Sequence, residues 1–184
     1  MNLPQQFINQ IESYGAPCLT CLCEALASTA PEVSVRVNRR KGASVPDGAD
    51  RVAWCPSGFY LEARRQFTFD PAFHQGLYYV QDASSMAVST VVETLTAGRG
   101  PVAYLDACAA PGGKSTQIAD ALAGQGLLVC NEPVPSRAKI LSRNIERMGV
   151  SNALVVSSEP EKLAPLWPEC FDAVLVDAPC SGEG

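Results

Sequence analysis

The chain has 184 residues, of which 47% are apolar and 18% charged, the balance of a globular protein with a sizeable core. Its net charge of −5 argues against a protein that coats nucleic acid non-specifically, while a local basic face stays compatible with it. No apolar run reaches transmembrane length, and the first residues lack the pattern of a signal peptide. We therefore expect a cytoplasmic protein without membrane attachment, whose eight cysteines are reduced thiols.

The first part of the chain predicts two short helices. Apolar residues at helical spacing indicate helices over residues 4–13 and 19–27. The second segment carries Cys18, Cys21 and Cys23, but no second pair of ligands lies at a useful spacing and the chain has a single histidine. We predict buried thiols there and no metal site.

Residues 33–37 alternate valine with polar residues, the pattern of a half-buried strand. The strand leads into the densest basic run of the chain, residues 39–41. This run is either a solvated strand end or a local basic patch for nucleic acid. Short strands are expected over residues 52–54 and 59–61. Residues 1–75 are therefore predicted to form a small α/β module.

A helix is predicted after residue 82. Ala87, Val91 and Leu95 follow one another at intervals of four residues and would form its apolar face, with Val88 and Val92 beside them. Asp82 or Ser84 would be the capping residue. We expect this helix to pack on the sheet that follows it in the chain.

From residue 102 onward, strands and helices alternate, which is typical of a parallel sheet with helices on its faces. Strands are expected over residues 102–106, 127–131, 153–157 and 173–176. Helices are expected over residues 115–123 and from residue 135 to a stop at Gly149. The apolar face of the second helix would comprise Ile140, Leu141, Ile145 and Met148. The predicted fold class is α/β.

The stretch LDACAAPGGKS, residues 105–115, joins a strand to a helix. In open α/β sheets such a turn brings a ligand against backbone N–H groups at a helix N-terminus. Gly112 and Gly113 allow the backbone to approach that ligand closely. The phosphate-binding P-loop needs a glycine where Cys108 stands, and the glycine spacing of dinucleotide-binding proteins is also missing.

Each of the four predicted parallel strands ends on or near an acidic residue, namely Asp106, Glu132, Glu159 and Asp177. The carboxyl ends of parallel strands share one edge of the sheet, where open α/β folds bind ligands. Carboxylates repel phosphate, so the ligand should carry hydroxyls, amines or positive charge. S-adenosylmethionine (SAM) has a ribose diol, an adenine amine and a sulfonium, and this edge favours it over NAD and ATP.

The motifs DACAAPGGKS (106–115) and DAPCSGEG (177–184), with Glu132 between them, resemble those of RNA (cytosine-5) methyltransferases of the Sun/Fmu/Nop2 type, closest to the bacterial ribosomal RNA enzymes. The stretches YVQDASSM (79–86) and RVN (36–38) are also similar to that family. The resemblance implies a Rossmann-like SAM-dependent methyltransferase domain over residues 76–184 that acts on RNA, most simply ribosomal RNA. It leaves the oligomeric state open.

The resemblance also implies a role for individual residues. The SAM site would be lined by the loop residues Cys108, Ala109, Ala110, Pro111, Gly112, Gly113 and Lys114. Glu132 would bind the ribose, Glu159 the adenine side, and Asp177 the methionine moiety and the target base; the family more often has aspartate at position 159. Contact with RNA is expected from Arg36, Arg39, Arg40 and Lys41.

The expected catalytic residues are Cys180 and Asp177. Cytosine C5 is a weak nucleophile, and a thiolate that adds to C6 activates it. In DNA enzymes the comparable Pro-Cys cysteine is that thiolate, whereas in the resembled RNA family a later Thr-Cys motif supplies it and the Pro-Cys cysteine assists product release. No Thr-Cys follows residue 180, and only four strands of a seven-stranded sheet are readable. We therefore expect a domain that is incomplete at its C-terminus and an inactive fragment of a longer enzyme.

Two other classes of function remain open on the sequence. A non-catalytic RNA-binding or assembly protein would keep the SAM-type fold and bind RNA without transferring a methyl group. A DNA (cytosine-5) methyltransferase would use Cys180 as its sole nucleophile and form a covalent adduct with DNA.

Overall fold

The computed structural model describes residues 3–14, 19–28 and 32–178. The chain divides into two compact units, residues 1–32 and 33–184. The first unit contains α1 (Gln5–Ser13) and α2 (Leu19–Ser28), which confirms the two helices predicted there. No residue of α1 is buried. The prediction of buried thiols in α2 is wrong, because Cys21 is exposed and Cys23 only partly buried, while Cys18 lies outside the described residues.

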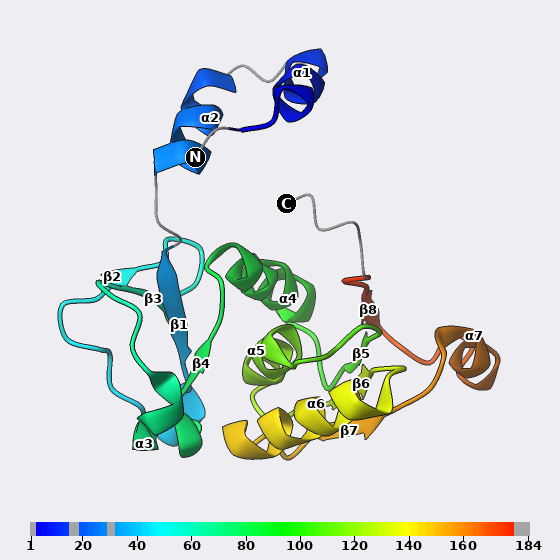
Figure 1. The fold of residues 1–184 in the computed structure, drawn as a ribbon. Coiled ribbons are helices and arrows are strands. Elements are labelled where there is room, and N and C mark those ends of the chain that lie inside the picture. The colour runs from blue at the N-terminus through cyan, green and yellow to red at the C-terminus, as the bar shows by residue number, and fades with distance from the viewer. Residues whose placement is uncertain (1–2, 15–18, 29–31, 179–184) are drawn as a thin grey trace. The chain divides into compact units, whose positions relative to one another are not determined.

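The second unit contains two sheets and their helices (Figure 1). Its strands are β1 (Val33–Val37), β2 (Asp50–Arg51), β3 (Gly58–Leu61), β4 (Tyr78–Val80), β5 (Ala103–Asp106), β6 (Leu127–Asn131), β7 (Ala153–Val156) and β8 (Ala173–Leu175). Its α-helices are α3 (Pro71–His74), α4 (Val88–Thr96), α5 (Gly113–Leu122), α6 (Pro135–Met148) and α7 (Pro160–Leu163). Short 3-10 helices are η1 (Arg39–Lys41), η2 (Phe67–Phe69), η3 (Ser84–Ala87) and η4 (Ala164–Leu166).

The first sheet is antiparallel, with the strand order β2-β3-β1-β4. β4 pairs with β1, so this small sheet includes a strand that follows residue 75. The prediction of a strand over residues 52–54 is wrong, because β2 ends at Arg51. Val52 instead packs with Cys55 and Met86 in a buried cluster. Burial of Val52 therefore did not require the strand to continue through it.

β1 is buried on both faces, so the expectation of a half-buried strand is wrong as well. Val35 and Val37 lie in the core of the small sheet. On the opposite face Arg36, and Asn38 just beyond the strand, are 0% exposed. Alternating polar residues predict an exposed face only where nothing polar covers them. Here α5 and α6 supply polar partners for that face.

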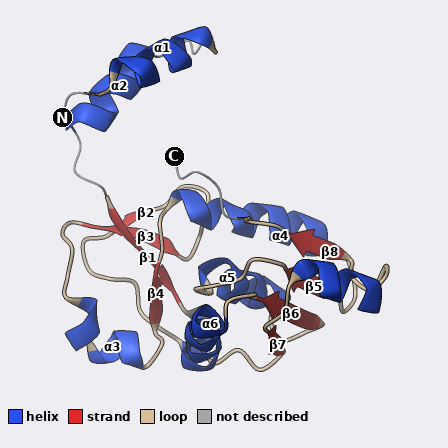
Figure 2. Cartoon of the chain, turned by 45° about the vertical axis from the view of Figure 1, so that its right-hand side comes forward, coloured by secondary structure: helices blue, strands red, loops and turns tan. Residues whose placement is uncertain are grey.

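The second sheet is parallel throughout, with the order β7-β6-β5-β8. α4, α5 and α6 cover one of its faces and α7 lies on the other (Figure 1). α5 lies between the two sheets (Figure 2). The predicted α/β fold with a parallel sheet is therefore confirmed. All four predicted strands are present, and their carboxyl ends meet at one edge.

α4 buries one side of the predicted apolar face. Val92 is buried and Val88 packs against the core of the parallel sheet, as predicted, whereas Val91 and Leu95 are exposed. Neither Asp82 nor Ser84 makes a side-chain capping bond, because η3 continues directly into α4. The valines and the leucine of α4 lie within roughly 100° around the helix axis. Only the Val88 and Val92 side of this arc meets the core of the parallel sheet.

α6 follows its prediction closely. Leu141, Ile145 and Met148 are buried as expected, although Ile140 is half exposed. The helix ends at Gly149, whose φ of 73° lies in the left-handed region that glycine adopts without strain. No helix in the described parts of the chain is both long and apolar enough to cross a membrane.

Candidate cofactor and substrate site

The acidic residues predicted at the strand ends lie along the carboxyl edge of the parallel sheet. Asp106 ends β5, Glu132 follows β6, Glu159 precedes α7, and Asp177 follows β8. Asp106 and Glu132 are buried, whereas Glu159 and Asp177 are exposed. The edge therefore combines two carboxyl groups held inside the fold with two that solvent reaches.

The glycine loop, residues 108–114, turns the chain from β5 into α5. The N–H of Ala109 donates to the carbonyl of Asn131 at 2.8 Å, which ties the loop to β6. Gly112 has a φ of 112°, and a Cβ there would lie 3.1 Å from Cδ1 of Leu141. This position therefore requires glycine for its backbone angle and for its close approach to α6.

Asp106 supports the glycine loop from beneath. Its Oδ2 accepts a hydrogen bond from Oγ of Ser115 at 2.7 Å, which joins the end of β5 to the first turn of α5. Its Oδ1 is buried and has no partner among the described residues. Burial raises the pKa of Asp106, and the Ser115 hydrogen bond partly opposes that rise.

A cavity of about 240 Å³ lies between the glycine loop and the end of β4. Its loop side consists of Cys108, Ala109, Ala110, Pro111, Gly113 and Lys114, together with Asp177. Its other side includes Tyr79, Gln81, Asp82 and Ser85. Sequence reasoning did not assign these four residues to the site, although the resemblance of residues 79–86 to the family was the available signal. The small sheet thus supplies one wall of the cavity.

Lys114 and Asp177 form an ion pair at this cavity. Lys114 lies in the first turn of α5, where the helix dipole disfavours a cation, and Asp177 compensates that charge. A P-loop lysine must instead be free to bind phosphate. The pairing therefore disfavours a nucleotide phosphate at the glycine loop.

The described cysteines near this edge are neutral thiols. Burial raises the pKa of Cys108, and the carboxylates of Asp106, Glu132 and Asp177 raise it further. Burial also raises the pKa of Cys130 to about 12. A thiol with a raised pKa is a poor nucleophile at neutral pH.

Glu132 is held by its own segment. Its Oε1 accepts from the N–H of Val134 at 3.0 Å, and its Oε2 lies 3.4 Å from Nη1 of Arg137. Nη2 of Arg137 also donates to the carbonyl of Ala110 at 3.1 Å, so this arginine bridges Glu132 and the glycine loop. Sequence reasoning missed Arg137; a cation in the first turn of a helix was the signal. Neither Glu132 nor Glu159 lines the cavity.

Arg36 is not a surface residue, which corrects its prediction as an RNA contact. Its side chain is 0% exposed and forms an ion pair with Asp120 of α5 at 2.6 Å. A polyanion that binds from solvent therefore has no access to this guanidinium.

The three residues of the basic run, 39–41, are exposed but differ in their contacts. Nε of Arg40 donates to Oδ1 of Asp120 at 3.0 Å. Nζ of Lys41 donates to backbone carbonyls at the ends of α3 and α6, at 2.6 and 2.7 Å. The carbonyl of Arg39 accepts from the N–H of Gly42, but its side chain makes no hydrogen bond or ion pair with any described residue. Arg40 and Lys41 thus attach the small sheet to neighbouring helices. The side chain of Arg39 is the member of the run that has no partner among the described residues.

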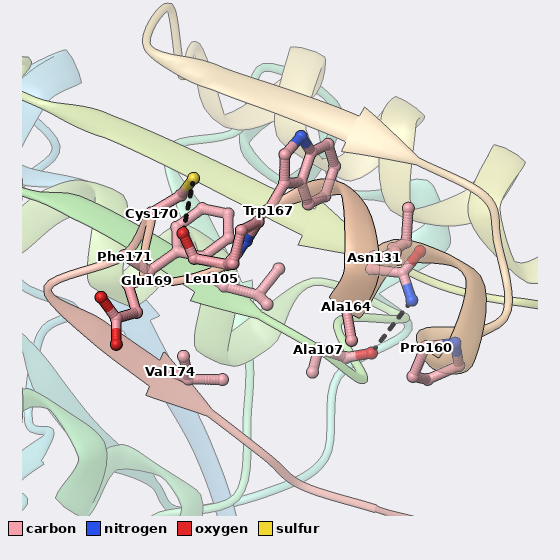
Figure 3. A pocket seen from close by; sticks show the side chains of 12 residues that line it. Leu105, Ala107, Asn131, Pro160, Ala164, Trp167, Glu169, Cys170, Phe171 and Val174 are labelled. Atoms are coloured by element: carbon pink, nitrogen blue, oxygen red, sulfur yellow. Dashed lines mark hydrogen bonds between the residues drawn. The ribbon is translucent and has the colours of Figure 1, made fainter.

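A second, mostly apolar cavity of about 350 Å³ lies on the other face of the parallel sheet, beneath α7 and η4 (Figure 3). Trp167 and Phe171 line it, and Nδ2 of Asn131 donates to the carbonyl of Ala107 at 3.3 Å beside it. No residue of the glycine loop lines this cavity, so it is separate from the first one.

The predicted catalytic residue Cys180 lies outside the described residues. Among the residues that the structure describes, no group of three or more His, Cys, Asp or Glu side chains is arranged to hold a metal ion.

Comparison with known proteins gives two family matches. The family described as 16S rRNA methyltransferase RsmB/F matches residues 94–184, and the N-terminal domain of 16S rRNA methyltransferase RsmF matches residues 3–83. The ribosomal RNA small subunit methyltransferase F of Shewanella piezotolerans is 36% identical over 193 residues, covering 98% of this chain and 40% of that protein. The chain thus spans about two fifths of the length of the curated relatives that match its whole length.

Solved structures agree with these matches. The crystal structure of PH0851 superposes with a TM-score of 0.84 at 25% identity, covering 96% of this chain and 41% of that one. NSun6 from Pyrococcus horikoshii with SFG has a TM-score of 0.72 at 17% identity, over 96% of this chain and 71% of that one, and supports the fold. With a glycine loop, acidic strand ends and two family matches that together span most of its length, the chain belongs to the RsmB/F family of 16S rRNA methyltransferases.

Proposed function

We propose that the protein transfers a methyl group from SAM to C5 of a cytosine in 16S ribosomal RNA, through a covalent adduct between a cysteine and the cytosine. The observation that carries this proposal is the cavity beside the glycine loop, which contains the ion pair of Lys114 and Asp177. Membership of the RsmB/F family supports the RNA substrate, since the matched relatives are named as ribosomal RNA methyltransferases.

The chemistry of the sheet edge fits SAM, which supplies an electrophilic methyl group when it is bound. The glycine loop offers backbone close to the ligand, and Glu132 offers a buried carboxylate for the ribose diol. Glu132 would exchange its bond with the N–H of Val134 for bonds with the two hydroxyls. Glu159 is exposed and makes no capping bond, so its carboxylate is available for the adenine side.

The target base would lie against Asp177, whose carboxylate forms an ion pair with Lys114. The carboxylate would stabilise the ring when it is protonated at N3. A cysteine thiolate adds to C6, which makes C5 nucleophilic enough to take the methyl group from sulfur; loss of the C5 proton then breaks the C6–S bond and releases the enzyme. Cys108 is unsuited to this role because its pKa is raised.

A cysteine variant tests the adduct and the role of Cys180 together. In the whole protein, incubated with SAM and 16S rRNA, Cys180→Ala should accumulate RNA-linked protein on a denaturing gel, because attack proceeds and release stalls. Wild-type protein, which turns over, serves as the control. An absent band together with lost methyl transfer would contradict the release role and make Cys180 the nucleophile.

The same assay separates the alternatives. A non-catalytic assembly protein would bind RNA yet transfer no labelled methyl group from SAM under any condition. A DNA (cytosine-5) methyltransferase would label DNA in preference to 16S rRNA. Either result would overturn the proposed function.

A further inference from the structure

Arg36 is the largest fully buried side chain in the described chain, and its guanidinium donates four hydrogen bonds. Nε donates to Oε1 of Gln81 at 3.0 Å, and Nη1 donates to Asp120 at 2.6 Å. Nη2 donates to Oγ1 of Thr116 at 2.6 Å and to the carbonyl of Gly113 at 3.3 Å. A residue of the small sheet thus reaches the backbone of the glycine loop.

Thr116 extends this contact along the loop. Its hydroxyl lies 2.8 Å from the carbonyl of Gly112 and 3.1 Å from that of Gly113. When this hydroxyl accepts from Arg36, its own proton is directed at one of these carbonyls. Arg36 therefore holds the two glycine peptides directly and through Thr116.

Gln81 connects Arg36 to the wall of the cavity. Gln81 lines the cavity opposite the loop, and its Nε2 donates to Oε1 of Gln117 at 3.0 Å. Nε2 of Gln117 in turn donates to the carbonyl of Met86 at 2.7 Å. Both walls of the cavity are therefore tied into one buried network that has Arg36 at its centre.

Neither packing nor the stability of α5 explains why an arginine stands at position 36. Burial of a guanidinium costs desolvation, and the N-terminal end of α5 repels a cation through the helix dipole. Apolar residues of similar volume often replace a buried ion pair without loss of stability. What an apolar residue lacks is a planar set of donors that reaches four differently placed oxygens at once.

We propose that Arg36 is a positioning residue for SAM, which fixes the peptides of Gly112 and Gly113 so that the loop presents its cofactor-binding backbone already in place. The inference rests on the proposed function, because it assumes that SAM binds at this loop. Arg36 would act on the SAM site from the small sheet without contacting SAM or RNA itself.

Arg36→Lys in the whole protein tests this inference, because lysine keeps a positive charge near Asp120 but lacks the planar set of donors. Asn38→Ala is the matched control. Asn38 is equally buried beside β1 and also crosses to the helices, but its Nδ2 donates to the carbonyls of Gly76 and Met148, away from the loop. Both variants are measured for SAM affinity by calorimetry and for stability by urea unfolding.

We expect Arg36→Lys to weaken SAM binding by about tenfold or more, the order that preorganisation contributes. Asn38→Ala should change SAM affinity by less than about twofold even where it loses as much stability. In turnover, the KM for SAM should rise in Arg36→Lys while kcat at saturating SAM changes little, a split that a general loss of folded protein does not produce.

Thr116→Val keeps the test informative if Arg36→Lys does not fold. It removes the hydroxyl between Arg36 and the glycine carbonyls, and Thr96→Val is its control, because Thr96 makes the same kind of helix bond in α4 without an arginine. Thr116→Val should weaken SAM binding and Thr96→Val should not. Equal SAM affinities across wild type, Arg36→Lys and Thr116→Val would overturn the positioning role and leave the proposed function intact. Wild-type protein that binds no SAM would overturn both.

Discussion

At the scale of single residues, Asp106 shows how a buried carboxyl can shape the site without facing the ligand. It holds Ser115 with one oxygen, while the other has no partner among the described residues. In the unfolded chain an aspartic acid titrates near pH 4. Because burial raises the pKa of Asp106, the folded state binds more protons than the unfolded state between the two pKa values. The free energy of unfolding should therefore fall as pH rises through that window, and then level off.

Asp106→Asn should remove this contribution. The difference in unfolding free energy between variant and wild type should move in favour of the variant as the pH is raised from about 4. In Ser115→Ala the free energy of unfolding should fall more than in wild type over the same rise in pH. Loss of the Ser115 hydrogen bond lets the pKa of Asp106 rise further. Urea denaturation across a pH series measures both. Parallel curves for all three proteins would show that Asp106 does not titrate with a raised pKa.

Glu132 is the residue whose charge we expect to matter most for the cofactor. Glu132→Gln keeps the size of the side chain but removes the charged acceptor proposed for the ribose diol. Hydrogen bonds to charged groups contribute about 1.5–3 kcal/mol each, so SAM affinity should fall by about ten- to a hundredfold. Glu161→Gln, an exposed change in the first turn of α7, is the control. Calorimetry that finds the same SAM affinity in both variants would rule out the ribose assignment.

At the scale of elements, most of the cationic side chains of β1 and η1 are bound to other parts of the fold. Arg36 and Arg40 share Asp120, and Lys41 bonds to the ends of two helices. The basic run therefore has a structural role in joining the small sheet to α5, α3 and α6. Arg39 is the member that the fold leaves free to meet a phosphate.

Arg39→Glu should consequently lower RNA affinity and reduce the slope of log affinity against log salt by about 1, the effect expected for one phosphate contact. SAM affinity should be unchanged, since Arg39 contacts neither the glycine loop nor the cavity. Arg99→Glu is the control. It makes the same charge change just before β5, at the amino ends of the parallel strands and away from the ligand-binding edge. Filter binding across a salt series compares the two. Equal slopes would mean that the run is a solvated strand end.

At the scale of the whole molecule, the two compact units should respond differently to SAM. A ligand that binds only the folded state stabilises it by RT ln(1 + [L]/Kd), about 2.7 kcal/mol at a hundredfold excess over Kd. Amide hydrogen exchange should slow across the second unit, and most in the glycine loop and α5. Amides of α1 and α2, which belong to the first unit, should exchange as before. Equal protection of α1 would contradict a cofactor site built by the second unit alone.

The parallel sheet and its ligand-binding edge can be predicted from local features of the sequence. Strand and helix periods, Gly112 and Gly149 at positive φ, and an acid after each strand are local signals, because they depend on backbone geometry and chain direction. The tertiary structure alone decided which polar residues face solvent. Arg36 follows the pattern of an exposed strand face, yet α5 supplies Asp120 and Thr116 to bury it. Its partners lie about 80 residues away in the chain, so no local pattern contains them.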